Sequence, residues 1–264
     1  MAGAAFGDAG TALGVSARPT LARRVVAEAT GTALLLAAVV GSGIMGERLA
    51  AGNVAVALLA NTLATGAALV ALILTFRPIS GAHLNPAVTL ADAFSGGFGW
   101  WEVPGYVVAQ VAGAFGGVAA AHLMFGEPIF FASRHARAGG AQVFSEFVAT
   151  FGLLAVIWGC ARLNAPRVPF AVAAYITAAY WFTASTSFAN PAVTLARSAS
   201  DTFAGIRPAD APAFIAAQLA GAGAATSLFR WLTPGPGAET EPATMVHTER
   251  PAVERSLSQR GGQR

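Results

Sequence analysis

The chain alternates between long apolar runs and short polar connections. Four runs contain no Asp, Glu, Lys or Arg, namely Leu49 to Phe76, Val103 to Gly126, Val168 to Ala196 and Ala211 to Phe229. Two further apolar segments, around 22–46 and 142–164, carry one interior carboxylate each, Glu28 and Glu146. A helix that crosses a bilayer needs roughly 20 mainly apolar residues. The pattern therefore predicts an all-α membrane protein with six transmembrane helices.

The two halves of the chain repeat the same landmarks in the same order. These landmarks are Glu-x-x-x-Thr at 28–32 and 146–150, NPAVTLA at 85–91 and 190–196, and the openings PGYVVAQVAGA from Pro104 and PAFIAAQLAGA from Pro212. The repeats cover about 21–126 and 142–232, and each holds three spans. An odd number of spans means that the second repeat inserts upside down relative to the first. Inverted repeats of this kind are typical of membrane transporters and channels.

Composition and charge agree with this membrane class. Only 11% of the residues are charged, whereas a soluble domain has about 25%. The net charge of +3 does not indicate a nucleic-acid partner, because the basic residues are all Arg and lie between spans. With both termini inside, the inner segments hold eleven Arg and the outer segments five, so the positive-inside rule favours cytoplasmic termini. Residues 1–20 and 233–264 are expected to be disordered, which leaves 21–232 as the membrane domain.

Each NPAVTLA heptapeptide predicts the start of a short helix. Asn is a good N-cap, and Pro is tolerated at the first helical position because its missing N–H would be unpaired there. The segments just before, SGAHL at 80–84 and STSFA at 185–189, are small and polar and are predicted to be re-entrant loops. Non-helical backbone is tolerated at membrane depth only where it is buried in protein or lines a wet cavity. We therefore expect two half-helices of roughly ten residues beside a cavity.

Inversion gives these half-helices a joint role. They enter from opposite faces and meet N-terminus to N-terminus near the midplane, where each end carries roughly half a positive charge. Asn85 and Asn190 can each donate an amide N–H to a passing solute. Half-helix dipoles exclude protons and cations in channels of this kind, so neutral hydrogen-bonding solutes are expected to pass.

Six spans, an inverted three-span repeat and paired NPA boxes resemble the aquaporin (major intrinsic protein) family. SGAHLNPAVT at 80–89 is close to the first-box signature of that family, and the resemblance covers about residues 22–232. It implies an aquaporin-like passive channel in the lipid bilayer, a homotetramer with one pore per subunit, no enzyme activity and no cofactor. The central constriction that it implies consists of Asn85, Pro86, Ala87, Asn190, Pro191 and Ala192.

The second box departs from the family pattern. Most members place Arg three residues after the second Asn, where this chain has Val193, and Arg197 does not obviously replace it. By their spacing to the boxes, the other three filter positions are Thr65, Ala178 and Ser187. Four small residues without a ring or a charge predict a wide outer constriction, because pore diameter and lining groups set selectivity. Polyols and metalloid hydroxides such as undissociated arsenious acid should then fit. The Val resembles a bacterial branch, similar to aquaglyceroporins and associated with arsenic resistance, which would place the protein in a bacterial-type inner membrane.

Three further side chains have competing interpretations. Glu28 and Glu146 either relay protons or, as their symmetry favours, accept hydrogen bonds from the re-entrant loops. His83 either faces the inner pore mouth or bonds a loop carbonyl. With four His and one Cys in the chain, no metal cluster is expected.

The alternatives to a channel with a widened filter are an ordinary water or glycerol channel and, from another class, an ion-coupled secondary transporter. A transporter of that kind would need a coupling site, for which Glu28 and Glu146 are the candidates.

Overall fold

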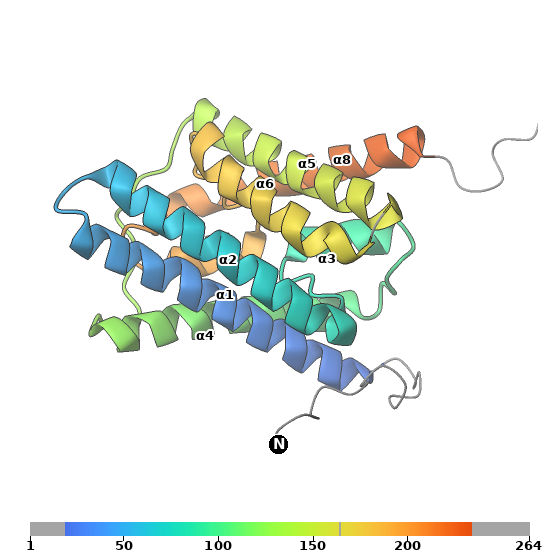
Figure 1. Cartoon of the computed structure of the whole chain (residues 1–264), viewed down its shortest axis with the longest axis horizontal. Coiled ribbons are helices and arrows are strands. Elements are labelled where there is room, and N and C mark those ends of the chain that lie inside the picture. The colour runs from blue at the N-terminus through green and yellow to red at the C-terminus, as the bar shows by residue number, and fades with distance from the viewer. Residues whose placement is uncertain (1–18, 164, 234–264) are drawn as a thin grey trace, which may run out of the picture. The chain divides into compact units, whose positions relative to one another are not determined.

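The structure is a computed structural model that describes residues 19–163 and 165–233. Its helices are α1 (Leu21–Leu49), α2 (Val54–Ser80), α3 (Pro86–Phe94), α4 (Val103–Phe125), α5 (Gly140–Leu163), α6 (Val168–Phe182), α7 (Pro191–Arg197) and α8 (Ala211–Leu232), with short 3₁₀ turns at Ala165–Arg167 and Pro208–Asp210 (Figure 1). The described residues form no strand, so the predicted all-α class is confirmed. The terminal segments predicted to be disordered lie almost wholly outside the described residues.

Five helices are long and apolar enough to cross a membrane, and they correspond to five of the predicted spans. The remaining span, α6, has only 15 residues. The charge-free run from Val168 to Ala196 is one run in sequence, but its helix α6 ends after 15 residues. Thr183 is extended, and the rest of the run becomes the second re-entrant loop and α7. A charge-free run in the sequence therefore indicates an apolar environment, but it does not predict one continuous helix.

The two repeats are built on matching close helix pairs, α1 with α4 and α5 with α8. Glycines in the repeated Ala-Gln-x-Ala-Gly-Ala segment permit these approaches. A Cβ added at Gly113 would lie 2.2 Å from the carbonyl oxygen of Ala29, and one added at Gly221 would lie 2.5 Å from that of Phe147. Small residues at such crossings let two backbones approach closely in membrane proteins.

Both half-helices begin as the heptapeptides predict. The Asn85 side chain accepts a hydrogen bond from Ala87 N, and the Asn190 side chain accepts from Ala192 N and Val193 N, with Pro next in each case. α3 has nine residues and α7 has seven, close to the predicted length. Two Asn-capped helices too short to span the membrane are therefore confirmed.

The two re-entrant loops follow the same backbone path. The residue just before each Asn has a positive φ, +49° at Leu84 and +48° at Ala189. Positive φ also recurs four residues before each Asn, where the first loop has Gly81 and the second has Thr186. Left-handed backbone at a β-branched residue such as Thr186 is strained, and strain of this kind persists only where the surroundings enforce it.

Candidate functional site

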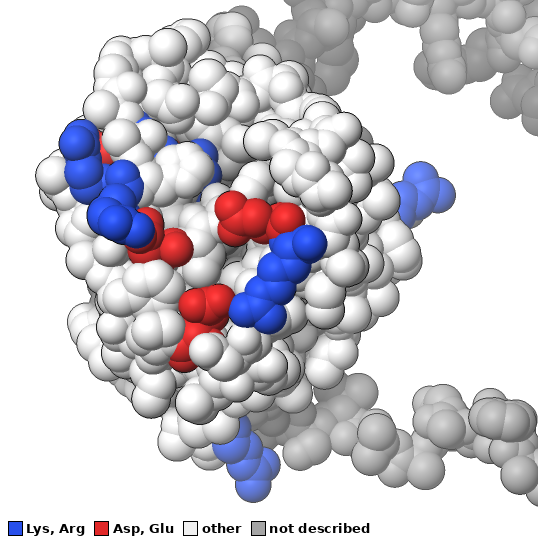
Figure 2. Space-filling model, turned by 90° about the vertical axis from the view of Figure 1, so that its left-hand side faces the viewer, with Lys and Arg blue, Asp and Glu red and all other residues white. Residues whose placement is uncertain are grey.

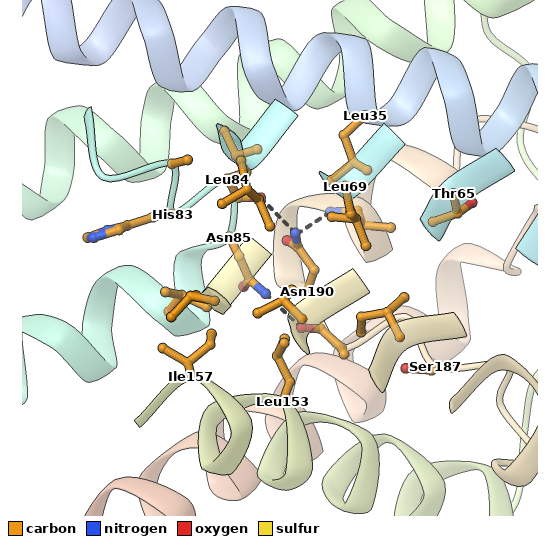
Figure 3. Close-up of a pocket in the computed structure, with 18 of the residues that line it drawn as sticks. Leu35, Thr65, Leu69, His83, Leu84, Asn85, Leu153, Ile157, Ser187 and Asn190 are labelled. Atoms are coloured by element: carbon orange, nitrogen blue, oxygen red, sulfur yellow. Dashed lines mark hydrogen bonds between the residues drawn. The ribbon is translucent and has the colours of Figure 1, made fainter. Parts of the chain in front are cut away.

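The two re-entrant loops are joined at the centre of the molecule by the two box asparagines. Asn85 Nδ2 donates to the carbonyl oxygen of Ala189 at 2.8 Å, and Asn190 Nδ2 donates to that of Leu84 at 2.8 Å (Figure 3). Each side-chain oxygen meanwhile caps its own half-helix. An amide NH₂ carries two hydrogens, so each Asn keeps one N–H beyond this cross-link.

Two fully buried carboxylates accept hydrogen bonds from the backbone of these loops. Glu28 accepts hydrogen bonds from the backbone N–H groups of His83 and Leu84, at 2.9 and 2.6 Å. Glu146 accepts from those of Phe188 and Ala189, at 2.8 and 2.9 Å. Buried backbone donors need such partners. The geometry supports the scaffold interpretation of both residues over a proton relay.

Two glutamines complete the same supports. Gln110 donates to Glu28 and to Thr89 Oγ1, at 2.8 and 2.9 Å. Gln218 makes the matching bonds to Glu146 and Thr194 Oγ1, at 2.6 and 2.9 Å. Neither glutamine was among the predicted site residues, although both lie in the repeated Ala-Gln-x-Ala-Gly-Ala segment.

A cavity of about 290 Å³ runs past the paired asparagines. Its walls are mostly aliphatic side chains of the long helices, and its polar side chains come from the re-entrant loops, the two half-helices with their Asn caps, and the long helices. Figure 3 shows His83 toward one end of it and Thr65 and Ser187 toward the other, with Asn85 and Asn190 between them. The cavity therefore extends from His83 past the paired asparagines to Thr65 and Ser187. Pro86, Ala87, Pro191 and Ala192 are buried behind the two Asn.

His83 borders the inner end of the cavity, together with Arg77 and Asp92. Its Nδ1 lies 3.1 Å from Thr89 Oγ1, and its Nε2 lies 3.4 Å from Asp92 Oδ2. The side chain thus faces the pore mouth while a hydroxyl and a carboxylate fix it, rather than a loop carbonyl.

At the outer end, the structure brings three of the four predicted filter residues together. Thr65, Ser187 and Val193 all line the cavity, but Ala178 does not. Ala178 lies on the exposed face of α6, in the same helical row as Ala174. The residues of α6 that reach the cavity are Val168, Val172, Ile176 and Tyr180. Ala178 therefore does not border this cavity, because two residues rotate the side-chain direction by roughly 200° around a helix.

Tyr180 adds an aromatic ring and a hydroxyl group to the end of the cavity that Thr65 borders. Its hydroxyl oxygen lies 3.3 Å from Thr65 Oγ1, and its ring borders the cavity. An aromatic side chain therefore stands where the sequence predicted only small residues.

Arg197 is a second residue at this end of the cavity that the predicted filter does not include. It lines the same cavity as Val193, four residues before it on α7, and residues at this spacing share a helix face. Its Cζ lies 3.4 Å from the centroid of the Phe188 ring, and its Nε donates to the carbonyl oxygen of Ala204. The outer end of the cavity therefore keeps a guanidinium.

A second buried arginine, Arg137, approaches the same ring from the loop between α4 and α5. Its Cζ lies 4.9 Å from the Phe188 centroid, its Nε donates to Gly205 O at 2.8 Å, and its Nη1 donates to Ser185 O at 3.1 Å. Burial lowers the pKa of Arg137 to about 10, so the side chain is still a cation at neutral pH.

The surface at the Thr65 end of the cavity carries mixed charge. Figure 2 looks onto the end of the molecule where α1 connects to α2, and acidic and basic side chains are interspersed there. Ion pairs join Arg48 to Glu127, Arg134 to Asp201 and Arg207 to Asp210, at 2.8, 2.7 and 2.8 Å. Within residues 19–163 and 165–233, no group of three or more His, Cys, Asp or Glu side chains is placed to hold a metal ion.

Comparisons with known proteins agree with this architecture. The family model described as "Major intrinsic protein" matches residues 16–168. The chain is 58% identical to the aquaglyceroporin AqpS of Rhizobium meliloti (strain 1021) over 212 residues, which cover 80% of this chain and 91% of that protein. It is 38% identical to aquaporin NIP1-3 of Oryza sativa subsp. japonica over 145 residues, 54% of this chain and 50% of that protein. The X-ray structure of the aquaglyceroporin from Plasmodium falciparum shares the fold with a TM-score of 0.59, at 21% identity, over 81% of this chain and 95% of that one.

Proposed function

Because the chain belongs to the major intrinsic protein family, we propose that it conducts small uncharged solutes, including glycerol and metalloid hydroxides such as undissociated arsenious acid, as well as water. Aquaglyceroporins of this family are passive channels, and the chain is not an enzyme. A relative that is 58% identical over most of both chains bears the name aquaglyceroporin. This relationship supports a solute channel rather than a strict water channel.

The observation that carries the proposal is the cavity that passes Asn85 and Asn190. Both half-helix N-termini point at the same central region, and each contributes a partial positive charge. Cations meet a barrier there, whereas a neutral hydroxyl-bearing solute can accept an N–H from either Asn. Between its two ends the cavity is lined mostly by aliphatic side chains, which offer no site for a coupling ion.

Val193 supports passage of solutes larger than water. Its side chain borders the cavity at the position where most of the family has Arg, and Thr65 and Ser187 are its small neighbours. We propose these three residues as part of the outer filter, with Asn85 and Asn190 as the central constriction. We also propose a homotetramer in a bacterial inner membrane with both termini in the cytoplasm, as the Arg distribution favours.

One observation favours a second candidate, an ordinary water and glycerol channel. The Tyr180 ring borders the outer end of the cavity and its hydroxyl meets Thr65. A ring at this position narrows the passage relative to the set of small residues that the sequence predicted. The two candidates differ in whether arsenious acid passes.

Solute flux into liposomes that contain the purified chain tests both candidates. Shrinkage and re-swelling report water and glycerol permeability, and arsenic content after rapid filtration reports arsenious acid. We expect all three to exceed the values for empty liposomes. Passage of water and glycerol without arsenious acid would leave the second candidate. Liposomes no more permeable than empty ones would overturn the channel itself, and accumulation against a solute gradient would indicate the coupled transporter.

A further inference from the structure

Arg197 holds hydrogen-bond donors at the outer end of the cavity that the protein does not use. Its Nε donates to Ala204 O, and among the hydrogen bonds of the described residues none involves Nη1 or Nη2. No carboxylate of the described residues forms an ion pair with it either, although the residue is only 2% exposed. A buried guanidinium whose terminal N–H groups lack acceptors is unfavourable. Since Arg197 borders the cavity, the cavity is where these donors find partners.

Phe188 fixes the direction of this guanidinium. The Arg197 Cζ lies 3.4 Å from the ring centroid, and a guanidinium that rests on an aromatic face is held as a plane with its N–H groups at the edge. Arg137 stands against the same ring and is tied to the carbonyl oxygens of Gly205 and Ser185. The Phe188 ring therefore lies against two guanidinium groups, that of Arg197 and that of Arg137 from the loop between α4 and α5.

Ser187 supplies a second unused polar group. Its side chain is 3% exposed, its Oγ has no hydrogen-bond partner, and the residue lines the same end of the cavity as Arg197. Figure 3 shows it near the end that Thr65 marks. A hydroxyl both donates and accepts, and leaving a buried hydroxyl unpaired is unfavourable. A solute at this point would satisfy it.

We propose that Arg197 and Ser187 form a solute-binding site at the outer end of the pore. Its ligands are small neutral molecules with several hydroxyl groups, either polyols or metalloid trihydroxides. Arg197 donates N–H bonds to solute oxygens, and Ser187 exchanges a hydrogen bond with a solute hydroxyl. The arginine that the family pattern places at position 193 is on this view displaced along α7 by one turn. The inference rests on the proposed function, because it assumes that solute passes this end of the cavity.

The test compares Arg197→Met, Ser187→Ala and the wild type in liposomes. We expect glycerol permeability to fall at least fivefold in Arg197→Met and at least twofold in Ser187→Ala, with water permeability within twofold of the wild type in both. The bonds lost are those that replace the hydration of a polyol, whereas water needs fewer. Arg134→Gln is the matched control, because Arg134 is an exposed arginine of the same face, and its fluxes should equal those of the wild type.

The possible results distinguish a failure of the proposed binding site from a failure of the proposed channel function. A wild type that conducts nothing overturns the proposed function. A conducting wild type whose ratio of glycerol to water permeability is unchanged in both variants overturns the site. If Arg197 only supported the loop at Ala204, Arg197→Met would lower water and glycerol permeability together. If that variant does not fold, Ser187→Ala decides, because removing one hydroxyl leaves the backbone path intact.

Discussion

Asn85 and Asn190 join the two re-entrant loops through a reciprocal pair of hydrogen bonds. Asn85 Nδ2 donates to the carbonyl oxygen of Ala189, and Asn190 Nδ2 donates to that of Leu84. Both asparagines also cap their own half-helices. The same two side chains therefore start α3 and α7, join the inverted repeats and line the pore.

Asn190→Asp should separate these roles. Asp caps a helix as well as Asn does, so α7 should persist. Its carboxylate would however face the carbonyl oxygen of Leu84 without a donor, at a cost of about 1–3 kcal/mol. We expect a lower thermal midpoint and a cation leak in liposomes at pH 7.5. Asn53→Asp is the control, since Asn53 caps α2 at an exposed site. Equal stability of the two variants would contradict the cross-link.

Glu28→Gln and Glu146→Gln should each destabilise the fold without changing the passive character of transport. An amide NH₂ would then face loop N–H groups that now reach a carboxylate oxygen, which costs about 1–3 kcal/mol for each variant. Thermal unfolding in detergent measures this loss, and Glu127→Gln in an exposed ion pair should change little. A pH gradient that drives uphill flux in the wild type but not in these variants would instead support a proton relay.

Gly113→Ala should be much more harmful than Gly116→Ala. A Cβ at Gly113 would lie 2.2 Å from Ala29 O, and backbone at a helix crossing cannot move aside cheaply. Overpacking of this kind costs about 1–3 kcal/mol. A Cβ at Gly116 meets nothing within 4 Å, so that variant should be neutral or slightly stabilising. Thermal midpoints of the two proteins in one detergent provide the comparison, and similar losses would refute the proposed contact between α1 and α4.

Asp201 should make a small, pH-dependent contribution to stability. Hydrogen bonds from the backbone N–H and the side chain of Arg134 lower the pKa of Asp201. A carboxylate with a depressed folded pKa stabilises the fold above its unfolded pKa of about 3.9, and the contribution is lost as pH falls through the folded value. The difference in thermal midpoint between wild type and Asp201→Asn should therefore shrink between about pH 5 and pH 2. A difference that stays constant over this range would exclude the ionised form as its source.

A short motif specifies local structure more surely than it specifies side-chain direction. NPAVTLA specifies local chemistry, an Asn cap followed by Pro, so both half-helices and their positions were predictable. Gln110 and Gln218 were also within reach, since the repeated segment around them marks a shared task. Sequence spacing could not decide whether Ala178 faces the cavity. Counting back from Asn190 gives a position in sequence, but the phase of α6 decides which side chain faces the cavity, and that phase selects Tyr180.

The reach of a long side chain is likewise not encoded in residue spacing. Arg197 lies beyond the box, and nothing in the sequence says that its guanidinium turns onto Phe188 and borders the pore. The carboxylate supports were easier to anticipate, because each repeat offers one intramembrane Glu and one loop with unpaired N–H groups.

Moving the arginine from position 197 to position 193, one helical turn nearer the paired asparagines, tests whether Val193 and Arg197 set the width of the outer filter. Val193→Arg alone would place two guanidinium groups on neighbouring turns of one helix face, where like charges repel. The double variant Val193→Arg with Arg197→Val keeps the charge constant and shifts only its depth. The new side chain would enter the cavity beside Thr65 and Ser187, so we expect glycerol and arsenious acid permeability to fall at least tenfold while water still passes. Because Val193 is buried, folding is checked first by gel filtration and thermal unfolding. A folded double variant with an unchanged solute size limit would show that neither Val193 nor the displaced arginine sets the width of the pore.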